Sequence, residues 1–279
     1  MKNGSQLTKR LLTGTALILF IALVLFRAPL WVFVLVPTLL IGLGLNEFFT
    51  LVDRKGIHIE RWIGLGVGLM IPLSIYNGFE PTKGWDLFFM VMALLTLFII
   101  QLRRRDSSHA IIGISTAFFG IFYISWCFSY LIKLRFLEGG PIPDGRWLIV
   151  LLLVVTKGGD IGAYFVGSWI GKHPLIQRVS PAKTWEGFFG GLLFSVAAAL
   201  ALHPVFPQVA WIHFWVLGLM LGVLGQLGDL SESMIKRDCH VKDSGDLLPG
   251  MGGVLDVIDS LLFTAPICYF YVRKFLIGV

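Results

Sequence analysis

The stretch "LLTGTALILFIALVLFRAPLWVFVLVPTLLIGLGLNEFFTLV", residues 11–52, decides the class of fold. It contains two apolar runs, residues 11–26 and 30–52, with Arg27 between them. A helix of roughly 20 apolar residues crosses a hydrocarbon core about 30 Å thick. The stretch therefore predicts two consecutive transmembrane helices. The first is short, and no convincing small-residue cleavage site precedes Arg27, so we expect it to be retained rather than removed as a signal peptide.

The same pattern continues along the chain of 279 residues, of which 56% are hydrophobic and only 14% charged. An ordinary soluble domain carries about 25% charged residues, and the mean hydropathy here is +0.80. The composition predicts an all-α, polytopic integral membrane protein with about nine transmembrane helices. The predicted spans are residues 11–26, 30–52, 62–79, 86–102, 110–132, 147–169, 187–206, 210–228 and 257–275.

The net charge of +6 is explained by membrane topology, because Lys and Arg fall in short clusters between the apolar runs. With the N-terminus in the cytoplasm, 15 of them lie on the cytoplasmic side and 7 on the other, and Lys157 within a span completes the total of 23. Cytoplasmic loops carry this excess. We therefore expect a cytoplasmic N-terminus and no nucleic acid partner. The expected location is a bacterial inner membrane. The three cysteines predict neither a zinc site nor a disulfide framework.

Polar residues are concentrated in the C-terminal half. Residues 1–146 are interpreted as a scaffold of membrane helices, and residues 147–279 as a catalytic region with cytoplasmic loops at 170–186 and 229–256. The predicted topology places both loops on the same face of the membrane. We expect them to meet over one site that faces the cytoplasm.

Residues 229–259 hold 10 of the chain's 40 charged residues in 31 positions. If the eighth span continues as a helix, the i, i+4, i+7 spacing of Asp229, Ser233 and Lys236 puts them on one face. The following "LPGMGG", residues 248–253, must interrupt a helix, because it contains proline and three glycines. Its backbone, with Gly252 and Gly253, is a candidate phosphate-binding turn.

Two carboxylates, Asp256 and Asp259, follow that turn at i, i+3 spacing, at the start of the last span. Carboxylates there are costly unless they are solvated, paired or bound to a cation. One explanation is that they simply flank the membrane and favour a helix N-terminus. Together with Asp229 and the nearby basic residues, they instead indicate a magnesium–nucleotide site. The basic residues are Lys236, Arg237 and Lys242.

A second polar group begins inside the sixth span, where Lys157 and Asp160 are spaced i, i+3. Such a pair within a membrane indicates function, although a purely structural ion pair also explains it. Ser180 and Lys183 belong to the cationic loop that follows, which suits an anionic lipid head group. Ordinary positive-inside charge explains its Lys and Arg equally well. Glycines in G-xxx-G spacing, at 187 and 191 and at 218 and 222, predict close helix packing and allow a homodimer.

The segment "SMIKRDCHVKDSGDLLPGMGGVLDVIDS", residues 233–260, closely resembles the C-terminal signature of the phosphatidate cytidylyltransferases, or CDP-diacylglycerol synthases. "GQLGDLSES" and "DIGAYFVG" with "GKHPLIQRVSPAKTWEGFFGG" are also similar to that family, so the resemblance covers roughly residues 157–265. The chain departs from the family pattern at Met251, where the pattern has His, and at Val257, where it has Arg.

The resemblance implies an enzyme of phospholipid biosynthesis that transfers the cytidylyl group of CTP to phosphatidic acid and releases pyrophosphate. It implies Mg²⁺, alone or with a second cation, and three metal ligands: Asp229, Asp256 and Asp259. With these, Ser233, Lys236 and Arg237 complete the expected catalytic set. Residues expected to bind substrate are Lys242, Asp243, Gly252, Gly253, Asp160, Ser180 and Lys183.

Two alternatives remain open. An altered-substrate or weakly active relative is suggested by Met251 and Val257. A secondary transporter is compatible with nine spans and with Lys157 and Asp160 in the membrane. A transporter predicts internal repeats, and none is evident in the sequence.

Overall fold

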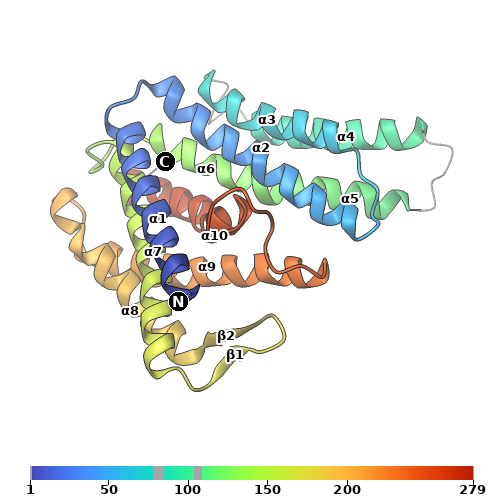
Figure 1. The fold of residues 1–279 in the computed structure, drawn as a ribbon. Helices are drawn as coiled ribbons and strands as arrows, with labels where there is room; N and C mark the ends of the chain where they lie inside the picture. The colour runs from blue at the N-terminus through green and yellow to red at the C-terminus, as the bar shows by residue number, and fades with distance from the viewer. Residues whose placement is uncertain (1, 78–84, 104–108, 279) are drawn as a thin grey trace. The chain divides into compact units, whose positions relative to one another are not determined.

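The computed structural model describes residues 2–77, 85–103 and 109–278, and the regular secondary structure of these residues is helical apart from one short β-hairpin (Figure 1). The N-terminal helices are α1 (Lys2–Phe26), α2 (Leu30–Arg54), α3 (Arg61–Tyr76), α4 (Trp85–Arg103), α5 (Ala110–Gly120), the π-helix η1 (Ile121–Trp126) and α6 (Cys127–Arg135). The later elements are α7 (Gly145–Ile170), β1 (Pro174–Ile176), β2 (Ser180–Thr184), α8 (Trp185–Ala201), η2 (His203–Val205), α9 (Trp211–Asp238), α10 (Leu255–Tyr271) and η3 (Val272–Ile277).

Six helical segments within the described residues are long and apolar enough to cross a bilayer. They are Leu30–Arg54, Ala110–Arg135, Gly145–Ile170, Trp185–Val205, Trp211–Asp238 and Leu255–Ile277. Three shorter apolar helices, Leu12–Phe26, Arg61–Tyr76 and Leu87–Arg103, match the remaining predicted spans. The prediction of an all-α, polytopic membrane protein is confirmed. Residues 78 and 79 of the predicted span 62–79 lie outside the described residues, and the orientation in the membrane stays a prediction.

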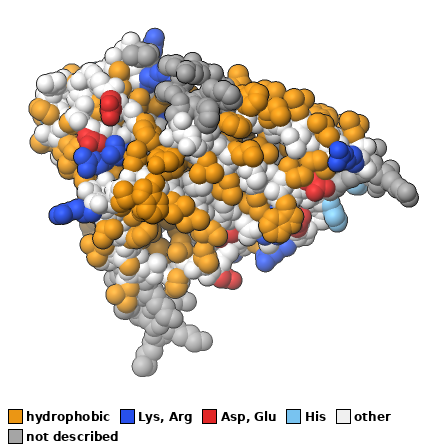
Figure 2. Space-filling model, turned by 90° about the horizontal axis from the view of Figure 1, so that it is seen from above, with side chains coloured by type: hydrophobic (Ala, Val, Ile, Leu, Met, Phe, Trp, Pro, Cys, Tyr) orange, Lys and Arg blue, Asp and Glu red, His pale blue; other side chains and the backbone are white. Residues whose placement is uncertain are grey.

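Large apolar side chains are exposed on the surface, as a bilayer requires. Figure 2 shows a face on which hydrophobic side chains predominate and charged ones are few. Trp169 and Leu102, for example, expose 86% and 83% of their surface. In water such exposure would be unfavourable by about 25 cal/mol per Å² of apolar area. Lipid tails remove that cost.

Both polar loops contain regular structure, and the helical continuation considered for the segment that begins at Asp229 is present. The first ten residues of the predicted loop 229–256 are helical, because α9 continues to Asp238. An i, i+4 ion pair between Glu232 and Lys236 stabilises this extension. In the other loop, 170–186, β1 and β2 pair antiparallel, with Pro174 opposite Thr184 and Ile176 opposite Ser180.

The chain divides into two compact units, one formed by Met1–Ile132 with Cys239–Val257 and the other by Lys133–Asp238 with Ile258–Val279. These units are defined by compactness and not by function. The division into a scaffold, residues 1–146, and a catalytic region, residues 147–279, stays a prediction. In the first unit, α2, α3 and η1 pack closely around fully buried side chains such as Leu45, Phe49 and Ile71. The Ser125 hydroxyl donates to the Gly68 carbonyl and so ties η1 to α3.

In the second unit, α7, α8 and α9 pack through glycines. A Cβ on Gly191 would lie 2.9 Å from the carbonyl oxygen of Gly159 on α7, and one on Gly218 would lie 2.6 Å from the Cα of Val196 on α8. Real Cβ atoms do not approach backbone so closely, so glycine is required at both positions. The predicted close packing of the G-xxx-G segments is confirmed within one chain, whereas a homodimer stays a prediction.

Side chains fix where two of these helices begin. Asp144 caps α7, with its Oδ1 accepting from the Arg146 N–H at 2.8 Å. The side-chain hydrogen bond from Arg146 lowers the pKa of the Asp144 carboxyl below its ordinary value. Thr184 caps α8, with its Oγ1 accepting from the Gly187 N–H at 3.1 Å. Threonine and aspartate are favoured at these positions because they satisfy N–H groups that have no partner within the helix.

Candidate active site

A polar cluster lies in the second unit, where α7 meets α10. Lys157 Nζ donates to the Ser260 hydroxyl at 2.7 Å and lies 3.1 Å from Asp160 Oδ2. It also lies 4.0 Å from Asp259 Oδ1. The Ser260 hydroxyl in turn lies 3.3 Å from Asp160 Oδ2. One ammonium group thus holds two carboxylates and a hydroxyl from two helices.

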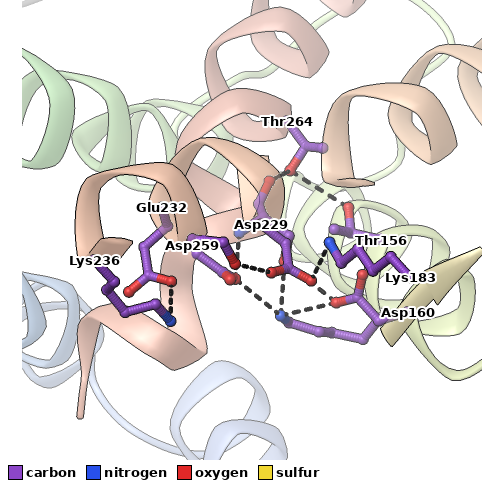
Figure 3. Close-up of polar contacts among 11 residues, drawn as sticks. Thr156, Asp160, Lys183, Asp229, Glu232, Lys236, Asp259 and Thr264 are labelled. Carbon is purple, nitrogen blue, oxygen red and sulfur yellow. Dashed lines mark hydrogen bonds and ion pairs between the residues drawn. The ribbon is translucent and has the colours of Figure 1, made fainter. Parts of the chain in front are cut away.

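Asp229 brings α9 into the same cluster. Its Oδ2 forms an ion pair of 2.7 Å with Lys183 Nζ on β2, and its Oδ1 lies 3.4 Å from the Ser233 hydroxyl. Figure 3 shows the carboxylates of Asp160, Asp229 and Asp259 facing a common space. The structure therefore brings together two of the three predicted metal ligands, and with them a residue expected to contact the lipid phosphate.

Glycines on α9 permit this approach of three helices. A Cβ on Gly228 would lie 2.7 Å from the Asp259 carbonyl oxygen on α10. A Cβ on Gly225 would lie 3.1 Å from Thr156 Cγ2 on α7. Gly228 meets backbone, so this position needs glycine or a shift of the helices, whereas at Gly225 a small displacement of the Thr156 side chain would suffice. Asp229 follows Gly228 directly, so its side chain lies beside this close contact between α9 and α10.

The charges of the cluster suit a divalent cation. Three carboxylates (Asp160, Asp229 and Asp259) face two ammonium groups, those of Lys157 and Lys183, which leaves one net negative charge. Carboxylate oxygens are ligands that Mg²⁺ prefers. Within the part of the chain that the structure describes, no three His, Cys, Asp or Glu side chains converge as a metal site. The donor set of Asp229 and Asp259 is chemically suitable, and Mg²⁺ binding stays a prediction.

The last turns of α9 carry the remaining predicted basic residues. Lys236 pairs with Glu232, which is fully buried. Arg237 Nε donates to the Val179 carbonyl at 3.3 Å, and Arg237 and Arg178 line one cavity of about 460 Å³. Glu232 was not singled out from the sequence, although its i, i+4 spacing to Lys236 was a usable signal.

The hairpin that presents Lys183 is held at its base by Glu186. Glu186 Oε2 accepts from the N–H groups of Lys172 and His173 at 3.2 and 3.3 Å, and its Oε1 lies 2.5 Å from His173 Nδ1. Ser180 opens β2, half-buried and opposite Ile176. The predicted lipid-binding pair therefore sits on one strand that is braced at its C-terminal end.

The glycine turn and Asp256 belong to the first unit. Asp256 Oδ2 accepts from the N–H groups of Gly253 and Ser244, at 2.8 and 3.0 Å, and lies 2.9 Å from the Ser244 hydroxyl. Gly250 and Gly252 adopt φ values of 79° and 95°, which L-residues rarely adopt. The predicted interruption of the helix and the need for glycine are confirmed. Asp256 therefore stabilises the conformation of the turn. Metal binding by Asp256 stays a prediction.

Glu47 on α2 is a further member of this turn that the sequence interpretation missed. Its Oε1 accepts from the Val254 N–H at 2.8 Å, and its Oε2 accepts from the Leu255 N–H at 2.9 Å. Ser244 Oγ lies 2.9 Å from the same Oε2. A signal was present, because Glu47 is the one charged residue in the apolar run 30–52 and ionisable residues in spans are usually functional.

Two predicted substrate residues, Lys242 and Asp243, lie exposed at the start of this segment, before the buried Ser244. Gly252 and Gly253 lie in the turn itself, where Leu248 and Gly252 form an isolated β-bridge. The predicted site residues therefore fall into two groups. One is the ionic cluster of the second unit with the end of α9, and the other is the turn of the first unit.

Fold and site together define a polytopic membrane protein whose helices bring together a partly exposed cluster of carboxylates and lysines. Residues 8–275 match the Cytidylyltransferase family, and the chain belongs to that family.

Three relatives from different bacteria illustrate the similarity. The chain is 36% identical to a phosphatidate cytidylyltransferase of Bacillus subtilis (strain 168) over 285 residues, which cover 97% of this chain and 99% of the relative. It is 35% identical to a phosphatidate cytidylyltransferase of Synechocystis over 268 residues, with 87% and 88% covered. It is also 34% identical over 272 residues to the uncharacterized protein YnbB of Escherichia coli (strain K12), with 98% and 89% covered.

Proposed function

We propose that this protein is a phosphatidate cytidylyltransferase, which joins the phosphate of phosphatidic acid to the α-phosphorus of CTP and releases pyrophosphate. The observation that carries the proposal is the cluster of Asp160, Asp229 and Asp259 with Lys157 and Lys183, in a chain of the cytidylyltransferase family. Two polyanionic substrates have to be brought together in this reaction. Carboxylates that can hold a cation, beside fixed ammonium groups, meet that requirement.

In this proposal the carboxylates bind the metal, and a lysine and a serine bind the lipid phosphate. Asp229 and Asp259, with Asp256 as the third predicted ligand, would hold Mg²⁺, alone or with a second cation. The metal would supply Lewis-acid stabilisation of the transferring phosphoryl group. Lys183 and Ser180 would hold the lipid phosphate, and Asp160 would orient the basic residues through Lys157.

The nucleotide would be held by the rest of the predicted set. Basic side chains neutralise the phosphates of CTP and the departing pyrophosphate, the Ser233 hydroxyl donates to a phosphate oxygen, and the glycines of the turn allow the nucleotide to approach the backbone closely. The residues assigned to these tasks are Ser233, Lys236, Arg237, Lys242, Asp243, Gly252 and Gly253.

The attacking oxygen needs no protein base. A phosphate monoester has a second pKa of about 6, so it is mostly a dianion at neutral pH. The phosphate of phosphatidic acid can therefore attack directly once it is positioned, and a bond forms to the α-phosphorus as the bond to pyrophosphate breaks. Met251, at the position where the family pattern has His, is compatible with this chemistry.

A second candidate is a related transfer to another anionic lipid acceptor, or a weaker form of the same reaction. Met251 and Val257 favour it, because they remove a titratable group and a cation that the family pattern has at those positions. Membrane transport is a weaker alternative, because the ionic residues are concentrated in the C-terminal half.

The test is a transfer assay with purified protein, CTP labelled in the α-phosphate and phosphatidic acid in mixed micelles. We expect the label to enter the lipid fraction only when Mg²⁺ and phosphatidic acid are both present. Label that enters lipid with a different acceptor would support the second candidate, and no label in any lipid would contradict both.

A further inference from the structure

Glu47 places an acidic side chain inside α2, in a segment apolar enough to span the membrane. Its sequence neighbours Phe48 and Phe49 are buried among apolar side chains. An ionised carboxylate in such surroundings is costly unless donors compensate for the lost water. The compensation comes from the segment 244–255, which lies about two hundred residues further along the chain.

Three donors of that segment converge on the Glu47 carboxylate. Val254 N–H and Leu255 N–H approach one oxygen each, at 2.8 and 2.9 Å, and the Ser244 hydroxyl lies 2.9 Å from Oε2. Leu255 is the first residue of α10, so the carboxylate satisfies N–H groups that have no partner within that helix. Glu47 therefore fixes the beginning of α10 as a capping residue would, but from another helix.

Gly245 and Gly253 leave room for the Glu47 carboxylate, which a side chain at either position would meet. A Cβ on Gly245 would lie 2.8 Å from Glu47 Oε1, and a Cβ on Gly253 would overlap both Glu47 Oε2 and Ser244 Oγ. The two carboxylates of Glu47 and Asp256 also share Ser244, whose single hydroxyl proton can be donated to only one of them at a time. Glu47 and the turn thus form one interlocked structure.

A second helix of the first unit also contacts the turn. Thr13 on α1 donates its hydroxyl to the Pro249 carbonyl at 3.2 Å, and the methyl group of Met251 lies 3.8 Å from a Cβ built on Gly14. Helix α1 therefore meets the tip of the turn, whereas Glu47 meets its two ends. Of the two, Glu47 makes the charged contacts, which are typically the stronger ones.

We infer that Glu47 is a positioning residue for nucleotide binding: its carboxylate holds the Ser244–Leu255 segment, which contains the glycine turn, in the conformation that binds CTP. The inference rests on the proposed function for the identity of the ligand. It gives the N-terminal half, expected from the sequence to be only a scaffold, a direct part in arranging the site.

The test compares Glu47→Gln with Asp53→Asn, a matched loss of one negative charge at an exposed position of the same helix. Glutamine keeps one acceptor oxygen but turns an NH₂ group toward a backbone N–H. Loss of a hydrogen bond to a charged group typically corresponds to about a tenfold change in binding. We expect the KM for CTP to rise about tenfold in Glu47→Gln, with the KM for phosphatidic acid unchanged. Asp53→Asn should match the wild type in both.

A second measurement does not depend on turnover. Lys242 is exposed just before the anchored segment, so the rate of tryptic cleavage after Lys242 in the folded, detergent-solubilised chain reports on its anchoring. We expect faster cleavage in Glu47→Gln and an unchanged rate in Asp53→Asn. Equilibrium binding of CTP with Mg²⁺ gives the affinity without catalysis. Weaker CTP binding with faster cleavage supports the inference even if the wild type transfers no cytidylyl group, an outcome that would contradict only the proposed function.

Ser244→Ala serves if Glu47→Gln does not fold, because it removes one of the three donors and leaves the carboxylate in place. We expect the same pattern with a smaller change, about threefold for one neutral donor. The inference is overturned if the folded variant binds CTP and is cleaved at Lys242 like the wild type. It is also overturned if only the thermal stability falls, since Glu47 would then be structural.

Discussion

Lys183 on β2 and Asp229 on α9 form an ion pair of 2.7 Å, which ties the hairpin to the helix that carries the candidate active site. Both side chains are partly exposed, at 24% and 36%. Pairs of this kind typically contribute less than about 1 kcal/mol to stability. The pair therefore explains little of the fold, and its position beside a predicted metal ligand points to a role in binding or catalysis.

Lys183→Gln should separate these two roles. Thermal unfolding in detergent should change little, because the Asp229 side chain is 36% exposed and is not left as a fully buried charge. The KM for phosphatidic acid should rise about tenfold, the equivalent of about 1.4 kcal/mol. Lys172→Gln, a loss of one exposed lysine in the same loop, is the control and should leave both values unchanged. Equal KM values in the two variants would show that Lys183 does not hold the lipid phosphate.

Asp256→Asn and Asp259→Asn should differ in stability although both lie at the start of α10. Asp256 Oδ2 accepts from two N–H groups of the turn, so the loss of the negative charge, which strengthens these hydrogen bonds, should lower the unfolding temperature. Asp259 is 6% exposed, and an amide there removes a buried charge at little cost in stability. We expect both to lower transfer by about 100-fold or more. Wild-type stability of Asp256→Asn in a thermal melt would contradict the role assigned to the turn.

Chelation should abolish the reaction. Without a divalent cation, the excess negative charge of the Asp229 and Asp259 cluster would repel both phosphate substrates. We expect EDTA to stop transfer from labelled CTP, and added Mg²⁺ to restore it. Full activity in EDTA would rule out the metal proposal while leaving the transfer reaction itself open.

Much of the fold could be predicted because hydropathy is a local property. Each span is encoded in its own run of apolar residues, and the G-xxx-G spacings indicated where α8 and α9 approach their neighbours. The hairpin was missed because its strands are only three and five residues long and carry no alternating apolar pattern. Strand identity there comes from pairing and from the contacts of Glu186.

The candidate site could be predicted only in part, for the same physical reason. Asp229 and Ser233 were placed on one face by their i, i+4 spacing, and the structure confirms their proximity. Glu47 lies 197 residues from Ser244, and no local pattern relates them. Lys157 was expected to pair with Asp160, which is confirmed, but its contact with Ser260 across 103 residues required the tertiary structure.

Restoring the family residues at the turn should change turnover little. In Met251→His, the added base has no proton to remove, because the phosphate of the lipid is already a dianion. In Val257→Arg, the added cation joins Lys236 and Arg237, which are already assigned to the phosphates of CTP. We expect less than about a threefold change in kcat, or roughly 0.7 kcal/mol in the barrier. A large gain in the transfer assay would instead identify the natural protein as a weakly active or altered-substrate relative.

Close packing of α8 and α9 should depend on Gly218. A Cβ there would lie 2.6 Å from the Cα of Val196, a backbone atom that cannot rotate away. We expect Gly218→Ala to cost about 1–3 kcal/mol, as overpacking usually does, and to lower the unfolding temperature in detergent.

The matched control for that variant is Gly66→Ala, also a glycine inside a membrane helix. A Cβ on Gly66 meets nothing within 4 Å, so the change should be neutral, or stabilising by up to about 1 kcal/mol through helix propensity. Loss of transfer activity should follow the loss of packing in Gly218→Ala, because α9 carries Asp229. If the two alanine variants melt at the same temperature, the helices can separate without penalty, and glycine packing does not hold Asp229 in place.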